Sequence, residues 1–303
     1  MLSSEDISFF CVVARSRSLA QAARKMNVTA PAVTQRLRAL ETRVGVRLLD
    51  RSLNGITLTD EGELVLAEGQ TIIDAVENLT DQLSDRTNTV RGHLQIVAPY
   101  GFGRRHIAPI VDAFSREYHE ATVTLHLSDT PTRMVNDNWD IIVHIGELNS
   151  PGRLMTTLAP NRRFLVASRD YLKGKPPLRH PHDLADHRCL ALRENDEDVT
   201  LWRFATAGEE QATIRIAPAM STNDGEILRD WTLAGLGLAV RSEWDVAAHL
   251  ASGALVRVLP QWNLPETNIV AFLNTRHNRS KRTSKMLEML RKGLKPTPWL
   301  QAE

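Results

Sequence analysis

The chain has 303 residues, 42% of them hydrophobic and 24% charged, and a formal net charge of +1. This composition is typical of a globular protein with two or three units, and it excludes disordered and collagen-like chains. No apolar run is long enough to cross a bilayer, and residues 1–16 lack a basic leader ahead of an apolar core, so we expect a cytoplasmic protein without membrane contact. Two cysteines, Cys11 and Cys189, are too few for a disulfide framework and are predicted to be core residues.

Near the N-terminus, two helices have separate start signals a short turn apart. Ser18 followed by Gln21 forms a capping box for the first helix, and Thr29 with Pro31 marks the start of the second. Gly45 supplies the stop signal of the second helix. Between these signals, one apolar stripe is formed by Val33, Leu37, Leu40 and Val44. This pattern predicts a helix-turn-helix.

The face of the second helix opposite this stripe is polar and then basic. Thr34 and Gln35 lie where side chains contact base edges, and Arg36 and Arg38 follow where guanidinium groups hold phosphates. The segment from residue 15 to residue 51 carries a local charge of +7 in a chain whose total is +1. Such a concentration of positive charge suits a DNA backbone. The alternative is a solvated basic hairpin within an enzyme.

The flanking segments predict a winged domain. A helix that begins with Ser3 and Asp6 would pack beneath the helix-turn-helix, and Asn54-Gly55 is a strong two-residue hairpin signal between short β-rich runs. Arg51, at the base of this hairpin, would reach a phosphate or the minor groove. The residues predicted to contact DNA are Ser18, Gln21, Thr29, Ala30, Pro31, Thr34, Gln35, Arg36, Arg38 and Arg51.

The next segment has the pattern of a long helix. Thr59 caps it, and from Asp60 to Asn88 it would span about 43 Å at about 1.5 Å per residue. Its net charge of −7, counted from residue 52 to residue 90, would be repelled by DNA. An apolar seam is formed by Val65, Ile72, Val76, Leu79 and Leu83. The seam predicts a dimerising linker, and the alternative is a helix packed within its own domain.

From His93 onward, short β-rich runs alternate with helical segments, which predicts an α/β domain. Residues 99–106 follow the first of these runs, and their glycines and arginines can hold an anion at a helix start. Residues 221–225 offer hydroxyl, amide and N–H donors before another helix. Facing each other across a cleft, the two clusters would suit a ligand with two acidic ends. The alternative is ordinary helix capping at both places. The predicted strands cover residues 94–98, 123–127, 141–145, 164–167, 190–192, 238–240 and 269–273.

Several N-terminal segments resemble the signature of LysR-type transcriptional regulators. They are SLAQAA (18–23), VTAPAVT (28–34), LE (40–41), GVRLL (45–49) and LTDEG (58–62). Ala30 stands where the family commonly has glutamine. The resemblance implies an α+β winged helix-turn-helix domain (1–59), a dimerising linker helix (60–91) and an α/β effector domain with two lobes, like periplasmic binding proteins. Lobe I would comprise 92–163 and 267–303, and lobe II would comprise 164–266.

Further segments of the α/β part are similar to the regulators of tartrate and malate degradation within this family. They are YGFGRRHIAP (100–109), NWDIIVHIGEL (138–148), the segment 221–228 and GLGLAVRSEWDV (235–246). This resemblance implies a small hydroxy-dicarboxylate effector. The implied effector-binding residues are Tyr100, Gly101, Phe102, Arg104, Ser128, Asp129, Glu147, Ser221, Thr222, Asn223 and Asp224. A carboxylate at Glu147 would repel an anion unless it were protonated or paired with an arginine.

No catalytic, metal or cofactor motif emerges elsewhere. His180, His182, Asp183 and His187 lack the helical spacing that aims two imidazoles at one metal, and they predict a polar turn. We therefore predict that the protein is not an enzyme but a sequence-specific transcription regulator without a cofactor. Its expected partners are double-stranded operator DNA, a small organic acid, a second copy in a homodimer or homotetramer, and RNA polymerase. The alternative is a cytoplasmic solute-binding or enzymatic module whose N-terminal helices serve assembly only.

Overall fold

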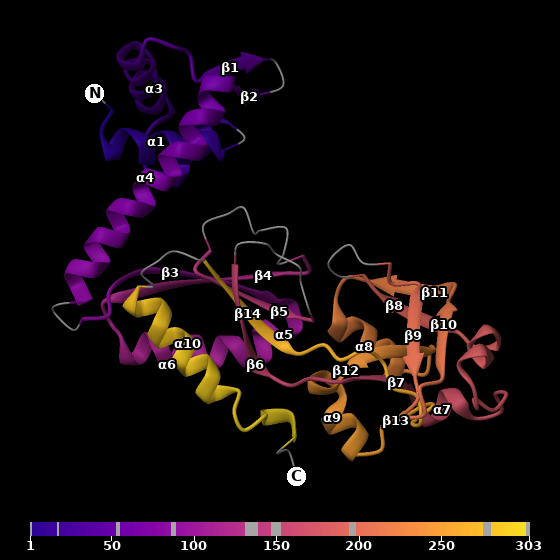
Figure 1. Ribbon diagram of the computed structural model, residues 1–303. Helices are drawn as coiled ribbons and strands as arrows, with labels where there is room; N and C mark the ends of the chain where they lie inside the picture. The colour runs from indigo at the N-terminus through magenta and orange to yellow at the C-terminus, as the bar shows by residue number, and fades with distance from the viewer. Residues whose placement is uncertain are drawn as a thin grey trace. The chain divides into compact units, whose positions relative to one another are not determined.

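The computed structural model describes residues 2–16, 18–52, 55–85, 89–130, 139–146, 153–193, 198–274 and 280–300. The chain divides into two compact units, Met1–Asn88 and Thr89–Glu303. Figure 1 shows the helices and strands of each unit. Within the described ranges, no helix has both the length and the apolar character needed to span a membrane.

The first unit is a winged helix-turn-helix followed by a long helix, as predicted. Its elements are α1 (Ser4–Ala14), α2 (Leu19–Lys25), α3 (Ala30–Val44), β1 (Leu49–Ser52), β2 (Gly55–Leu58) and α4 (Asp60–Asp85). Strands β1 and β2 pair antiparallel from Leu49 opposite Leu58 to Ser52 opposite Gly55, which makes the wing. Asn54, expected in the turn of the wing, lies outside the described residues.

Local signals in the sequence account for most helix ends in this unit. Helix α1 begins at the predicted residues, where Ser3 and Asp6 form a reciprocal capping box. At the start of α2, the Ser18 hydroxyl accepts a hydrogen bond from the N–H of Gln21 at 3.2 Å, as one half of the predicted capping box. Thr29 occupies the N-cap position of α3, but its side chain makes no capping hydrogen bond, so that part of the prediction was wrong. Gly45 ends α3 with a φ of 79°, a conformation that glycine adopts at little cost.

The apolar stripe of α3 is the centre of the core of the first unit. Val33, Leu37 and Leu40 are buried there together with side chains of α1, α2 and the wing. The Glu41 carboxylate accepts hydrogen bonds from the N–H groups of Leu48 at 2.9 Å and of Leu49 at 3.3 Å. Packing and these hydrogen bonds therefore fix α3 relative to both the supporting helices and the wing.

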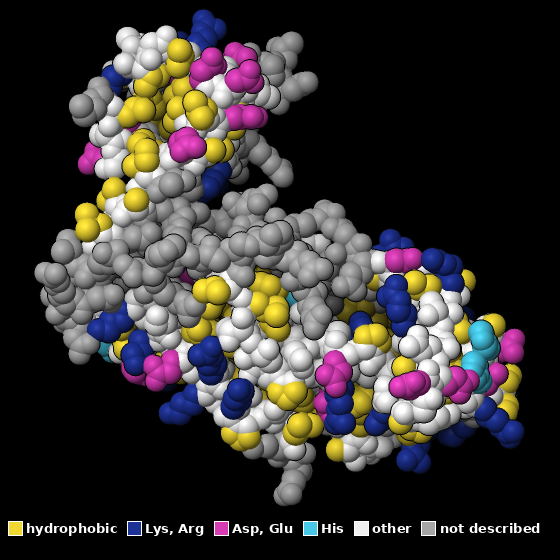
Figure 2. Space-filling view, viewed as in Figure 1, with side chains coloured by type: hydrophobic (Ala, Val, Ile, Leu, Met, Phe, Trp, Pro, Cys, Tyr) yellow, Lys and Arg dark blue, Asp and Glu magenta, His cyan; other side chains and the backbone are white. Residues whose placement is uncertain are grey.

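Helix α4 has two different halves. Its first half packs within the unit, because Val65 lies against the core and a Cβ added at Gly69 would overlap the side chain of Ile7 on α1. The alternative of packing within the domain is therefore correct for this half. Farther along the helix, Ile72, Val76 and Leu79 are exposed by 47%, 47% and 58%. Figure 2 shows hydrophobic side chains uncovered on the surface of this unit. The side chain of Leu83 lies outside the described residues.

The second unit contains two five-stranded sheets, each with its own helices. The first sheet has the order β4 (Ala121–Ser128), β3 (Gly92–Pro99), β5 (Ile141–Ile145), β14 (Ile269–Asn274) and β6 (Arg153–Ala159). The second has the order β11 (Pro218–Thr222), β8 (Cys189–Leu192), β12 (Leu238–Ser242), β7 (Arg163–Ser168) and β13 (Leu255–Arg257). A separate hairpin pairs β9 (Leu201–Ala205) with β10 (Gln211–Arg215).

Helices cover both sheets (Figure 1). Those of the first sheet are α5 (Tyr100–Phe102), the π-helix η1 (Gly103–Ile107), α6 (Ala108–Glu117), α10 (Lys281–Gly293) and the 3₁₀ helix η4 (Pro298–Leu300). Those of the second sheet are α7 (Arg169–Leu172), the 3₁₀ helix η3 (Pro181–Asp186), α8 (Gly225–Leu233) and α9 (Glu243–Ala251). We call the first sheet with its helices lobe I and the second with its helices lobe II.

All seven predicted strands are confirmed, whereas β6, β9, β10, β11 and β13 were not predicted. Most of these five strands carry more polar residues or are very short, so their apolar pattern is weaker than that of the strands that were recognised. The chain crosses to lobe II between β6 and β7 and returns between β13 and β14. This double crossover creates the two-lobed fold.

Each lobe has a main hydrophobic core, and Trp244 of α9 in lobe II is buried in the core of lobe I. Lobe I buries the apolar faces of β3, β5 and β14 against α6 and α10, whereas lobe II buries those of β7, β8 and the β9–β10 hairpin. At the crossing between the lobes, Asn161 is 1% exposed, and its Nδ2 donates to the carbonyl oxygen of Thr267 at 2.9 Å. Its Oδ1 accepts from the N–H of Trp244 at 3.5 Å. The two connecting strands are therefore tied by one buried amide.

The exposed apolar residues of α4 generate a prediction about assembly. We expect the protein to be at least dimeric at about micromolar concentration, because a partner helix would remove these side chains from water. Replacing Ile72 and Leu79 together by Asp should place charges in that interface and give monomers by light scattering. Ala67→Asp adds a charge on a different face of the same helix and should leave the dimer intact. A monomeric wild-type protein would contradict the linker assignment.

Candidate DNA-binding and effector-binding sites

One face of α3 carries half of the ten residues predicted to contact DNA. Ala30, Pro31, Thr34, Gln35 and Arg38 line one open concavity on the first unit. Gln35 and Arg38 are exposed, and Thr34 is half-buried. This face is suited to a major groove, since amide and hydroxyl groups lie ahead of a guanidinium group along the helix. The side chain of Arg51 lies outside the described residues.

Arg36 lies on a different side of α3 from Arg38. Its Nη2 donates to the carbonyl oxygen of Glu5 at 3.2 Å, and its guanidinium carbon lies 4.6 Å from the centre of the Phe9 ring. Both contacts are with α1 or its side chains. Arg36 therefore holds two helices of the domain together, a role that its position beside other polar residues in the sequence did not reveal.

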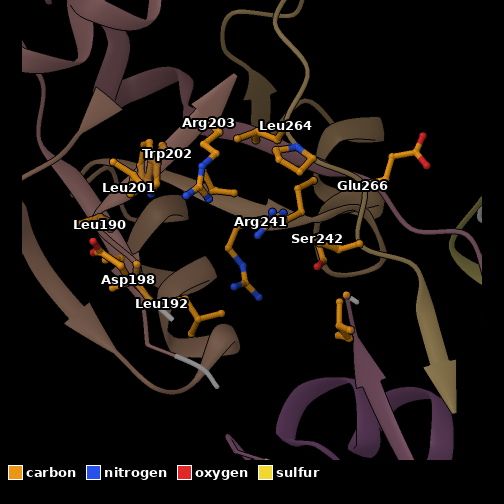
Figure 3. Close-up of a pocket in the computed structure, with 18 residues that line it drawn as sticks. Leu190, Leu192, Asp198, Leu201, Trp202, Arg203, Arg241, Ser242, Leu264 and Glu266 are labelled. Carbon is orange, nitrogen blue, oxygen red and sulfur yellow. The ribbon is translucent and has the colours of Figure 1, made fainter. Parts of the chain in front are cut away.

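A cavity of about 540 Å³ lies at the ends of the central strands of lobe II and reaches lobe I at Ile145 and Gly146 (Figure 3). Its lining includes Trp202 and Arg203 on β9, together with Arg241 and Ser242 on β12. None of these four residues was predicted from the sequence to bind an effector. The signal that could have found Arg241 is a charged residue following the apolar run of a buried strand.

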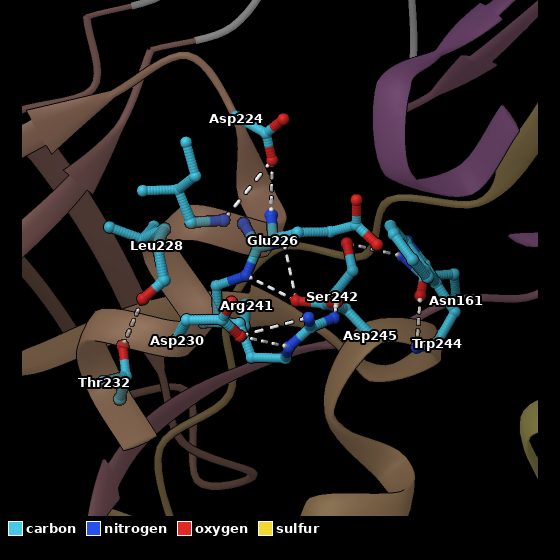
Figure 4. A network of polar contacts seen from close by, with 12 residues as sticks. Asn161, Asp224, Glu226, Leu228, Asp230, Thr232, Arg241, Ser242, Trp244 and Asp245 are labelled. Atoms are coloured by element: carbon cyan, nitrogen blue, oxygen red, sulfur yellow. Dashed lines mark hydrogen bonds and ion pairs between the residues drawn. The ribbon is translucent and has the colours of Figure 1, made fainter. Parts of the chain in front are cut away.

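Buried charges fix Arg241 in the wall of this cavity (Figure 4). Arg241 is 3% exposed, and its Nε and Nη2 donate to Oδ2 of Asp245 at 2.9 and 2.7 Å. The other oxygen of Asp245 accepts from Nη1 of Arg229 at 2.7 Å. One buried carboxylate thus holds two guanidinium groups, and Nη1 of Arg241 makes no hydrogen bond to another described residue. Arg241 is a pre-oriented cation next to the cavity.

Four of the predicted effector-binding residues join the two lobes instead of lining the cavity. Nη2 of Arg104, in lobe I, pairs with Oδ2 of Asp224 at 3.3 Å and also with the carboxylate of Glu226. Nδ2 of Asn223 donates to Oδ2 of Asp129 at 2.7 Å. The bond to Glu226 is the largest factor that raises the pKa of Arg104 above its ordinary value. These residues form a polar contact that spans the lobes.

Asp224 also has a structural task in lobe II. Its Oδ1 accepts hydrogen bonds from the N–H groups of Glu226 at 2.8 Å and of Ile227 at 3.3 Å, which caps α8. Burial raises the pKa of Asp224, but these hydrogen bonds and Arg104 lower it more, so that the pKa falls below its ordinary value. The carboxylate is therefore kept ionised at the start of α8.

The other predicted effector-binding residues surround this contact. Tyr100, Gly101 and Phe102 form α5, and a Cβ added at Gly101 would lie 3.1 Å from Cη2 of Trp244 and 3.3 Å from Cγ of Glu226. Lobe II thus covers the helix start that was predicted to hold an anion. Three more candidates are described. Oγ of Ser128 accepts a hydrogen bond from the N–H of Thr130, and Oγ1 of Thr222 accepts one from the N–H of Asp224. Ser221 is exposed. Glu147 lies outside the described residues.

The histidine-rich segment 180–187 forms the predicted polar turn. His180 caps η3 through its ring Nδ1, which accepts from the N–H of His182 at 3.2 Å, and Asp183 completes the capping box. The rings of His180 and His182 are stacked with their centres 4.8 Å apart. Across the described part of the chain, no three His, Cys, Asp or Glu side chains are grouped so that they could hold a metal ion.

Comparison with protein families explains this combination of units. Residues 4–63 match the bacterial regulatory helix-turn-helix protein, lysR family, and residues 87–295 match the LysR substrate binding domain. The chain belongs to the LysR family. The resemblance found in the sequence is thereby confirmed over both units of this LysR-type regulator.

Curated relatives cover nearly the whole regulator. The HTH-type transcriptional regulator DmlR of Escherichia coli K12 is 33% identical over 286 residues, which are 94% of this chain and 92% of DmlR. The HTH-type transcriptional activator TtdR of Escherichia coli K12 is 32% identical over 259 residues, which are 86% of this chain and 83% of TtdR.

Solved structures support the fold. The full-length Vibrio cholerae virulence activator AphB has a TM-score of 0.63 at 22% identity and covers 95% of this chain and 98% of its own. CrgA, a LysR-type regulator from Neisseria meningitidis, has a TM-score of 0.58 at 24% identity and covers 97% of this chain and 99% of its own.

Membership of the family answers the main functional question. LysR-type regulators bind DNA through the helix-turn-helix, bind small-molecule effectors through the second domain and act as oligomers. The protein is therefore a transcription regulator and not an enzyme. The alternative of a solute-binding or enzymatic module with assembly helices is not supported.

The different positions of Arg36 and Arg38 generate a prediction about DNA binding. Arg38→Ala should weaken binding to all sequences alike and reduce the slope of log K against log salt by about one, as expected when one phosphate contact is lost. Arg36→Ala removes the same charge only two residues away and is the matched control. It should leave the slope nearly unchanged and lower the thermal midpoint instead. Equal losses of slope in both variants, measured by fluorescence anisotropy, would contradict this assignment.

Proposed function

We propose that this regulator is controlled by a small organic acid that binds in the cavity between its lobes. The observation that carries the proposal is the pair of guanidinium groups, from Arg203 and Arg241, on one cavity wall. Arg203 is exposed and makes no ion pair with the other described residues, so its charge is available to a ligand. Arg241 offers the free Nη1 described above.

The size and lining of the cavity are compatible with a small-molecule acid. A volume of about 540 Å³ is within the range of small-molecule sites. Ser242 supplies a hydroxyl group and Trp202 an indole ring beside the two arginines. The two arginines favour an anionic ligand, and a hydroxy-dicarboxylate such as tartrate or malate agrees with the subfamily that the sequence resembles. The predicted residues 100–104 and 221–224 would close over such a ligand from the contact between the lobes.

Binding of the acid would change DNA binding by shifting the populations of the two lobe arrangements. An acid that contacts both lobes favours the arrangement in which they are closest, and this arrangement biases how the winged domains of an oligomer meet their half-sites. The oligomer would be a homodimer or a homotetramer joined through α4. Its further partner would be RNA polymerase, and its place would be the cytoplasm, where DNA and the polymerase are.

Arg203 provides the direct test of the cavity. Arg203→Gln should weaken tartrate or malate binding at least about tenfold in calorimetry, because a charge-assisted hydrogen bond to a carboxylate contributes about 1.5 to 3 kcal/mol. Arg257→Gln is the matched control, since Arg257 is also in lobe II but lies over the Phe164 ring at 4.1 Å, outside the cavity. A wild-type protein that ignores C4 diacids but binds a cation or an uncharged aromatic would overturn the proposed ligand class.

A further inference from the structure

The carboxylate of Glu226 lies at the position where the sequence predicted that a carboxylate of the effector would bind. The Glu226 side chain reaches from the first turn of α8 in lobe II to Arg104 in lobe I. Its Cγ and Cδ lie 3.3 and 3.6 Å from the position of a Cβ added at Gly101. The space beside Gly101 and Arg104 therefore accepts a carboxylate, and the present occupant is a residue of this protein.

Of the two acids that meet Arg104, Glu226 is the one that can leave. Asp224 uses Oδ1 to cap α8, so its side chain is fixed by the backbone. The Glu226 carboxylate makes no hydrogen bond or ion pair with any described residue except Arg104, and its side chain is 32% exposed. Rotation about the side-chain bonds of Glu226 would free Arg104 without disturbing the helix.

The same turn of α8 connects Arg104 with the cavity. Gly225 packs directly on the guanidinium of Arg241, and an added Cβ would overlap its Nη2. The next residue, Glu226, contacts Arg104. The first turn of α8 thus lies between one arginine of the cavity and the arginine that joins the lobes. An acid held by Arg241 would therefore lie next to the helix turn that carries Glu226.

We propose that Glu226 is an internal competitor of the effector for Arg104. This inference rests on the proposed function, since the effector must carry a carboxylate. When the acid binds, its carboxylate takes the place of the Glu226 carboxylate, and one carboxylate–guanidinium pair replaces another. Arg104 keeps a partner throughout, so the exchange avoids leaving a cation unpaired. The link between the lobes through Glu226 is then replaced by a link through the ligand.

A permanent brace is the competing explanation, and it predicts the opposite sign. If Glu226 only held the lobes together, its removal would loosen the effector domain and weaken acid binding. If Glu226 competes with the acid, its removal tightens binding. An exposed ion pair contributes modestly, so we expect Glu226→Gln to lower the Kd for malate or tartrate by about two- to fivefold. Glu226→Asp, with its charge kept on a shorter side chain, should fall between the wild type and Glu226→Gln.

The experiment compares these variants with Glu288→Gln by calorimetry at constant ionic strength. Glu288 pairs with Lys285 at 2.8 Å in an exposed contact on α10, so its replacement changes the net charge equally without touching the interlobe contact. Sulfate is a second probe, because this small anion can bind to the Arg104 guanidinium when residue 226 carries no carboxylate. It should raise the thermal midpoint of Glu226→Gln more than that of the wild type or of Glu288→Gln.

Each outcome decides one of the two proposals. Tighter diacid binding and a new response to sulfate in Glu226→Gln alone would support competition. Failure of every variant to bind diacids, with the sulfate response still specific to Glu226→Gln, would reject the effector class and support the competitor. The inference would be overturned if the Glu226→Gln protein bound diacids and sulfate no better than the Glu288→Gln protein, or more weakly.

Discussion

The arrangement of the effector domain depends on contacts between its two lobes, which are polar around Arg104 and apolar around Trp244, whose ring centre lies 5.4 Å from that of Phe102. Arg104 meets Asp224 and Glu226 across the boundary, and Asp129 meets Asn223. Ion pairs that remain partly exposed contribute about 0 to 1 kcal/mol each, so these contacts do not lock the lobes. A ligand with a few kcal/mol of binding energy is able to replace them. The polar part of the interlobe contact is therefore suited to exchange with a ligand.

The wall of the cavity has the opposite character. The carboxylate of Asp245 is 0% exposed and holds Arg241 and Arg229, so breaking this cluster would leave a buried charge unpaired at a cost of about 3 to 5 kcal/mol. Arg241 consequently keeps its orientation whether or not an acid is bound. In the proposed acid site, Arg241 would be the rigid cation and the Arg104–Glu226 pair the contact that a ligand exchanges.

The sequence was sufficient for features that depend on neighbours in the chain. The capping of α1 and α2, the stripe of α3 and the seven apolar strands all follow from local spacing. Contacts between distant residues were not predictable in the same way. Arg36 and Arg38 look alike until α1 supplies Glu5 and Phe9 as partners for Arg36. Arg104 was expected to hold an effector, and its partner Glu226 became visible only when the fold brought two helix starts together.

Hydrogen exchange of the full chain with and without acid tests most directly whether the lobes respond together. The account predicts that tartrate or malate slows exchange at 145–146 in lobe I and at 240–242 and 224–228 in lobe II at the same ligand concentration. Such joint protection would follow from one ligand contacting both lobes and both arginine sites. Protection confined to one lobe, or absent at saturating acid, would contradict control of this regulator by an acid bound between the lobes.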